Sequence, residues 1–149
     1  MYTPHTVTIY NVTVEVAPET LREETTNHIT VLRGVFLDES KGANVRTSGL
    51  ENADAATLFV PFSVRAVDGF NGSTKRFVPW DEFIKAEDKS ALWTLDVGRN
   101  TYFVKGVVVD ADATVSKLEM TTSGVYMVSK VDAKDYGSPS MQHWEVGGA

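Results

Sequence analysis

The sequence contains no cysteine. This absence excludes disulfide bonds, cysteine-containing zinc sites and thiol nucleophiles. Long apolar runs are also missing, since no stretch approaches the roughly 20 residues that span a bilayer. The N-terminus has no charged segment followed by an apolar one, so we expect no signal peptide. These absences predict a soluble protein that is made in the cytoplasm and has no membrane partner.

Basic residues are few and scattered. Lysine and arginine number 14 against 20 aspartates and glutamates, which gives a net charge of −6. The densest basic cluster is the pair Lys75 and Arg76. A protein that binds a phosphate backbone uses many basic contacts and releases counterions, and this chain offers too few for that mode. Its 149 residues and 42% apolar content suffice for one folded domain, which we expect to span residues 1–149.

Most of the apolar pattern is typical of β-strands. Apolar residues alternate along the run 7–16, but their parity changes near Tyr10, which predicts a bulge or a strand end there. Residues 29–37 form a second apolar run, and we expect it to pair antiparallel with the first. Between them, the polar segment 18–27 is expected to be a connecting loop or a single helical turn.

Shorter strand patterns and helical patterns follow. Pro61, inside the apolar run 57–65, indicates an edge strand or a bulge. Helical spacing predicts short helices over residues 80–88 and 112–120, the second capped by Asp112. The whole pattern predicts a mainly β fold. We expect a small antiparallel β-barrel or sandwich of about seven or eight strands, with one or two short helices and a long loop.

Two segments are candidates for contact with a partner. Residues 38–56 are polar with little to bury, and at about 19 residues they exceed the usual loop length. We therefore expect a long loop that becomes ordered against a partner. Residues 141–146 form a strand pattern that contains a tryptophan, whereas frayed tails are normally small and polar. This pattern predicts a strand that pairs or docks, with the candidate docking residues Met141, His143, Trp144 and Glu145.

The sharpest catalytic pattern is an apolar strand followed by Asp110, Asp112 and Thr114. It resembles the first motif of haloacid-dehalogenase-type phosphotransferases, in which the first aspartate is the nucleophile and the second is the general acid and base. That family also needs a parallel α/β domain with a downstream lysine and further carboxylates, and too little chain follows Thr114 to supply it. We favour the alternative, a strand-to-helix turn.

Histidines and aromatic residues are the remaining candidates. The three histidines lie on separate expected strands without the spacing of metal ligands, so we expect polar-face positions: His5, His28 and His143. Strand aromatics could stack single-stranded nucleic acid in an oligonucleotide-binding barrel, but that mode also needs a basic groove. We favour core positions for them: Phe59, Phe62, Phe77, Trp93, Tyr102, Phe103 and Tyr126. We therefore expect no catalytic residue, metal or cofactor, and a structural role.

Several short motifs together resemble small neck, or minor capsid, proteins of tailed phages and prophages. The layout also resembles the broader head-closure family, whose members are called head-completion or head–tail connector proteins. The motifs are VLRGVFLDESKGANV at 31–45, FVPF at 59–62, WTLDVG at 93–98 with VKG at 104–106, YMVSKV at 126–131 and HWEV at 143–146.

The resemblance implies a β-barrel subunit that forms a homo-oligomeric ring beneath the portal, in the neck of the virion. Such a ring closes the DNA-filled head and provides the surface to which the tail attaches. The implied partners are further copies of the chain, the portal or an adaptor protein, the tail terminator or tail tube, and the packaged double-stranded DNA in the channel. A tail terminator or another minor virion protein is the alternative within this class.

The resemblance also implies roles for particular segments. The loop 38–56 would reach toward the channel or a partner and help to hold DNA back, with the candidate residues Lys41, Asn44, Arg46 and Glu51. An acidic lining would let DNA pass without sticking, which suits a net charge of −6. A ring subunit also needs unpaired strand edges, and we expect the terminal strand and the strand with Pro61 to supply them.

Overall fold

The structure is a computed structural model that describes residues 2–39, 56–122 and 124–149. Over these residues the chain is mainly β, as the sequence predicts. The strands are β1 (His5–Val16), β2 (Glu23–Glu39), β3 (Ala56–Pro61), β4 (Arg65–Asp68), β5 (Arg76–Phe77), β6 (Leu92–Trp93), β7 (Gly98–Lys105), β8 (Val125–Lys134) and β9 (His143–Gly148). The helices are α1 (Trp80–Lys85), α2 (Val115–Thr121) and the 3₁₀ helix η1 (Pro139–Met141).

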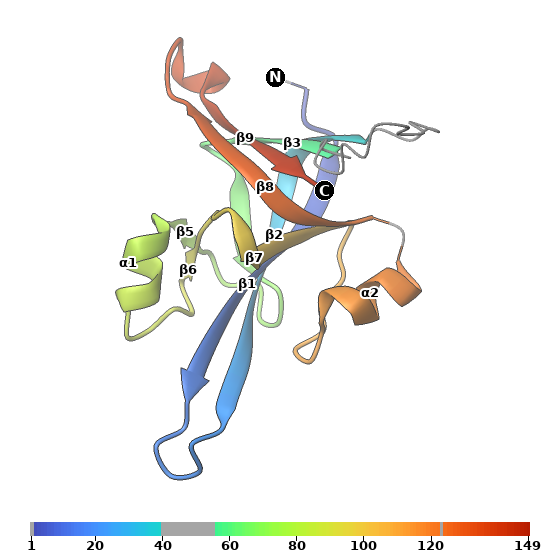
Figure 1. Cartoon of the computed structure of the whole chain (residues 1–149). Helices are drawn as coiled ribbons and strands as arrows, with labels where there is room; N and C mark the ends of the chain where they lie inside the picture. Colours follow the sequence, from blue (N-terminus) through green and yellow to red (C-terminus); the bar gives the residue numbers. More distant parts are fainter. Residues whose placement is uncertain (1, 40–55, 123) are drawn as a thin grey trace, which may run out of the picture.

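Six strands pair in a closed antiparallel ring. Their order is β1-β7-β8-β9-β3-β2, and β2 closes the ring by pairing with β1, the pairing that the sequence predicts. The strand β4 adds to β2 next to β3, and β5 and β6 form a separate parallel pair. The ring is sandwich-like and not a true barrel, so it confirms the expected fold class in its broader form (Figure 1).

The two strands expected at edges lie inside this ring, so that prediction is wrong. The terminal strand β9 pairs with β8 on one side and with β3 on the other. The strand β3 lies between β9 and β2, and Pro61 is its last residue. A proline is tolerated at this position because the ladder ends there and the missing N–H interrupts no central pairing.

The change of apolar parity in β1 does not come from a bulge near Tyr10. The register of β1 against β2 is continuous there, and the only shift lies between His5 and Thr6. Instead, β1 is buried on both faces. Ile9 packs into the main core inside the ring, and Tyr10 packs into a second cluster on the opposite face, which α2 covers through Leu118.

Half of the polar segment 18–27 is strand, since β2 begins at Glu23, so the expected connecting loop is present only at residues 18–22. The strands β1 and β2 continue as a hairpin that projects away from the rest of the sheet, with a turn at residues 17–22 (Figure 1). Leu21 lies in this turn at φ 54°, in the left-handed region that non-glycine residues adopt mainly in turns. We call residues 12–27 of this hairpin the arm.

Both predicted helices are present, with differences at their ends. In α1, Phe83 is buried as the spacing predicts, but Ile84 is exposed. In α2, the residue that caps the first turn is Thr114 and not Asp112, because the Thr114 hydroxyl accepts the N–H of Lys117 at 3.1 Å. The hydroxyl therefore satisfies one of the N–H groups that a helix leaves unpaired at its start.

Candidate functional site

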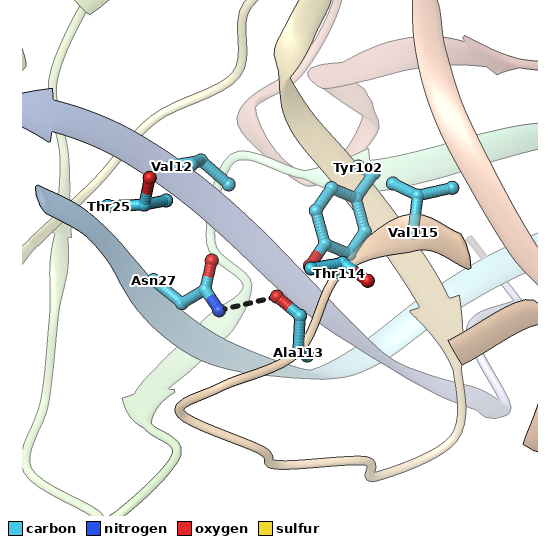
Figure 2. Close-up of a pocket in the computed structure, with 7 residues that line it drawn as sticks. All are labelled: Val12, Thr25, Asn27, Tyr102, Ala113, Thr114 and Val115. Carbon is cyan, nitrogen blue, oxygen red and sulfur yellow. Dashed lines mark hydrogen bonds between the residues drawn. The ribbon is translucent and has the colours of Figure 1, made fainter. Parts of the chain in front are cut away.

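A pocket lies at the base of the arm, between the arm, β7 and the start of α2 (Figure 2). Its volume is about 170 Å³, close to the size of a cavity that holds a benzene ring. Most of its lining is apolar, and the polar atoms come from a few side chains. The lining residues are Val12, Thr25, Asn27, Tyr102, Ala113, Thr114 and Val115.

Asn27 holds the arm against the loop that precedes α2. Its side-chain N–H group donates to the carbonyl oxygens of Ala111, at 3.0 Å, and of Ala113, at 2.8 Å. Because both partners are acceptors, they determine which end of the amide is the nitrogen. The side-chain oxygen of Asn27 is then buried, and no hydrogen-bond partner for it exists among the described residues.

Tyr102 forms the opposite wall of the pocket. Its ring stacks on that of Tyr10, with centroids 4.7 Å apart and an interplanar angle of 8°. The Tyr10 hydroxyl donates to the carbonyl of Val108 at 2.6 Å and accepts the N–H of Asp110 at 3.2 Å. The Tyr102 hydroxyl, in contrast, is buried and has no partner within the described part of the chain.

The electrostatics keep the phenol of Tyr102 neutral. Burial raises the pKa of Tyr102 well above its usual range, and the neighbouring Tyr10 and Asp110 raise it further. The pKa of Tyr10 is also raised by burial. The two unpaired atoms of the pocket lining are therefore a neutral hydroxyl, which can donate or accept, and an amide oxygen, which can only accept.

The aspartates of the phosphatase-like motif lie in the turn between β7 and α2, the alternative that the sequence favours. Asp110 lies in the loop after β7, which is a strand of the antiparallel sheet. Its carboxylate accepts the N–H of Asp112 at 3.0 Å and forms an ion pair with Lys117 at 3.2 Å. These two contacts lower the pKa of Asp110. The side chain of Asp112 is exposed. In the described part of the chain, no three histidine, aspartate or glutamate side chains gather to hold a metal ion.

The candidate docking residues of the C-terminal strand have different environments. Trp144 is half-buried, and the centroid of its ring lies 4.4 Å from that of Phe62 and 4.3 Å from that of Phe77. His143 and Glu145 contact each other at 3.2 Å, and Met141 is exposed. Trp144 therefore packs inside the protein. The candidate loop residues lie outside the described residues: Lys41, Asn44, Arg46 and Glu51.

The strand aromatics pack within the protein. Trp93, Tyr102 and Phe103 are buried, which confirms their expected core positions. The remaining four of the seven are partly buried, and each has a ring contact with another aromatic residue: Phe59, Phe62, Phe77 and Tyr126. None of the seven is left open as a stacking platform.

The arm exposes an apolar stripe that is continuous with the pocket. Val14 and Val16 are 53% and 57% exposed, and they share a strand face with Val12, which lines the pocket. Leu21 at the tip is 80% exposed. Outside the hairpin itself, residues 13–16 and 23–26 pair with no other described strand. The alternation of valines in the sequence was the signal for this stripe.

A model of a family of unknown function, DUF6751, matches residues 2–149. The chain belongs to this family. Neither a curated protein nor a solved structure matches the chain. Among the described residues, no helix is both long enough and apolar enough to cross a bilayer.

His28 follows the arm in β2, and its side chain is half-buried. Its Nε2 atom lies 2.9 Å from the hydroxyl of Thr13, and its ring meets that of Phe83 edge-on at 5.4 Å. Burial lowers the pKa of His28 to about 4, together with the charges of Lys75 and Lys89 and against a weaker effect of Glu15. The folded protein therefore favours the neutral imidazole.

This shift predicts a loss of stability at mildly acidic pH. The unfolded chain binds the proton near pH 6.5, whereas the folded chain binds it only near pH 4, so the contribution is complete above pH 6.5 and is lost as the pH falls toward 4. Since the ring is half-buried, we expect the free energy of unfolding to fall by about 1 kcal/mol between pH 7.5 and 5.

Urea denaturation at both pH values, with His28→Gln as the reference, measures this effect. The wild-type protein should lose about 1 kcal/mol more than the variant, because the variant has no imidazole to protonate. Equal losses in the two proteins would show that His28 titrates normally in the fold.

Proposed function

We propose that this protein is a structural virion protein of the phage head–tail neck. As a subunit of a ring beneath the portal, it closes the DNA-filled head and provides the surface for tail attachment. The observation that supports this function best is the arm, a two-stranded hairpin with Val14, Val16 and Leu21 exposed. The second support is the resemblance of the sequence motifs to head-closure proteins.

A hairpin of this kind needs a partner. Two strands alone are at best marginally stable in water, and exposed strand edges that carry apolar residues invite pairing with another chain. In a ring of identical subunits, each copy presents one surface to its neighbour and a different surface to the next one. The arm and the ring of strands are two such surfaces, and we assign the arm to contact with the adjacent subunit or with the portal or adaptor protein.

The charge of the arm is compatible with a DNA channel. Residues 12–27 include four glutamates and one arginine: Glu15, Glu19, Glu23, Glu24 and Arg22. An acidic surface repels the phosphate backbone, so double-stranded DNA passes such a surface without being held. The proposed partners on the tail side are the tail terminator or the tail tube. The proposed function involves no catalysis and no cofactor.

Loss of the gene tests this function directly. In the phage or prophage that carries the gene, we expect its deletion to give heads that package DNA, lose it again and carry no tails. Electron microscopy and the amount of packaged DNA measure the result, and a plasmid copy of the gene should restore infectious particles. Cryo-electron microscopy of intact virions should place the protein in the neck.

Two outcomes would contradict the proposal. Particles of normal shape and titre without the protein would exclude a structural role in the virion. Full heads that keep their DNA, together with detached tails of irregular length, would instead indicate a tail terminator.

A further inference from the structure

The pocket at the base of the arm contains two buried polar atoms that the described residues leave without a partner. They are the hydroxyl oxygen of Tyr102 and the side-chain oxygen of Asn27. Tyr102 is only 2% exposed, and its ring stacks on the ring of Tyr10. A buried polar group without a hydrogen bond costs about 1–3 kcal/mol, so two of them beside one cavity favour a hydrogen-bonding group that enters the cavity.

We propose that this pocket binds a neutral group of about the size of a benzene ring that carries a hydroxyl or a primary amide. The cavity of about 170 Å³ accommodates a group of this size. The apolar walls formed by Val12, Ala113 and Val115 would contact the body of the ligand. Its polar end would meet the two unpaired atoms, which come from the arm and from β7 (Figure 2).

The unpaired atoms select the polar group of the ligand. The Asn27 oxygen can only accept, so the ligand must supply an N–H or O–H donor. The Tyr102 hydroxyl remains neutral, because its pKa is raised, and it can donate to an oxygen of the ligand. A hydroxyl and a primary amide each combine a donor with an acceptor. A carboxylate has no donor for Asn27.

The lack of charge in the pocket lining also disfavours charged ligands. None of the residues that line the pocket is charged, so an ion that entered would lose its hydration without gaining a counter-charge. The same chemistry could come from a free small molecule or from the tyrosine side chain of a second copy of the chain. A second copy could lie along the stripe of Val14 and Val16, which continues from the pocket. This proposal does not depend on the role in the phage neck.

Titration with phenol, followed by two-dimensional NMR, tests the site. We expect saturable shifts at the residues that line the pocket, with a dissociation constant of about 1 mM for so small a ligand. Benzamide should bind similarly and benzoate should not. In Tyr102→Phe the affinity for phenol should fall about fivefold to tenfold, because one hydrogen bond is lost, whereas the weaker affinity for benzene should remain.

Two further variants sharpen the test. Tyr136→Phe is the matched control, since Tyr136 is 69% exposed on another loop, and it should bind phenol as the wild type does. Ala113→Leu fills the cavity and should abolish binding of both phenol and benzene. An absence of saturable shifts in the wild type, or an equal affinity of Tyr102→Phe for phenol, would overturn the proposal and indicate a pocket that holds only water.

Sedimentation experiments distinguish the two sources of the ligand. If the group belongs to a second copy, the average mass should rise with protein concentration, and phenol or Tyr102→Phe should reduce this rise. If the group is a free small molecule, the protein should bind phenol and its mass should not change with concentration. Both results require the phenol site, so its absence remains the decisive contrary outcome.

Discussion

Val146→Asp is expected to unfold the protein at room temperature. Val146 is fully buried in the main core, in the middle of β9, where it pairs with Leu58 of β3 and Val131 of β8. A carboxylate at this position would lose its hydration without gaining a partner. The neighbouring core side chains would also lose their contacts with the two methyl groups of the valine. We expect a loss of at least about 4 kcal/mol, a large part of the stability of a typical domain.

Circular dichroism during thermal and urea denaturation measures this loss. Met141→Asp is the matched control, because Met141 belongs to the same C-terminal segment but is 52% exposed, and its free energy of unfolding should change by less than about 0.5 kcal/mol. A Val146→Asp protein that melts cooperatively within a few degrees of the wild type would show that β9 is a detachable strand.

The same geometry shows that the C-terminal strand pairs, as its pattern predicts, and that it does so inside the ring of strands. Removal of β9 would open the ring between β8 and β3, and both strands would lose their pairing on that side. Gly148 also packs closely, since a Cβ atom at this position would lie 2.7 Å from the ring of Phe103 and from Cβ of Tyr126. The end of the chain is therefore part of the core, and only its exposed side chains remain available to a partner.

The double variant Val14→Asp, Val16→Asp is expected to leave the fold intact and to prevent assembly. Both valines are more than half exposed on the arm, so a charge there costs little in the isolated protein. In a complex, the same carboxylates would lie in an apolar contact. Changing one central residue of an interface typically costs about 2 kcal/mol of binding free energy. The affinity for the neighbouring subunit should therefore fall at least about thirtyfold.

The measurement is complementation of a phage that lacks the gene. The double variant should give far fewer infectious particles than the wild type, although the purified protein melts at nearly the same temperature. Val97→Asp is the control, because Val97 is also a valine that is more than half exposed but lies outside the arm. Normal titres from the folded double variant would show that the valine stripe is not an assembly surface.

Local patterns were sufficient for much of the fold. The antiparallel pairing of β1 with β2 and the helix around Phe83 both follow from segments that are close in sequence. The helix depends on a few neighbouring residues, and the two strands follow each other directly in the chain. The cap of α2 does not follow from local pattern, because Thr114 and Asp112 have similar capping chemistry and only the end of the preceding loop selects Thr114.

The sequence by itself determined that the chain is mainly β, that it has no cysteine chemistry, and which side chains are apolar enough to be buried. Only the tertiary structure decided what buries them. The parity change in β1 records two clusters on opposite faces, and Val146 is central because two distant strands enclose it. Asn27 and Tyr102 meet at one pocket for the same reason: contacts between distant segments depend on how the whole sheet closes, and no local periodicity contains that information.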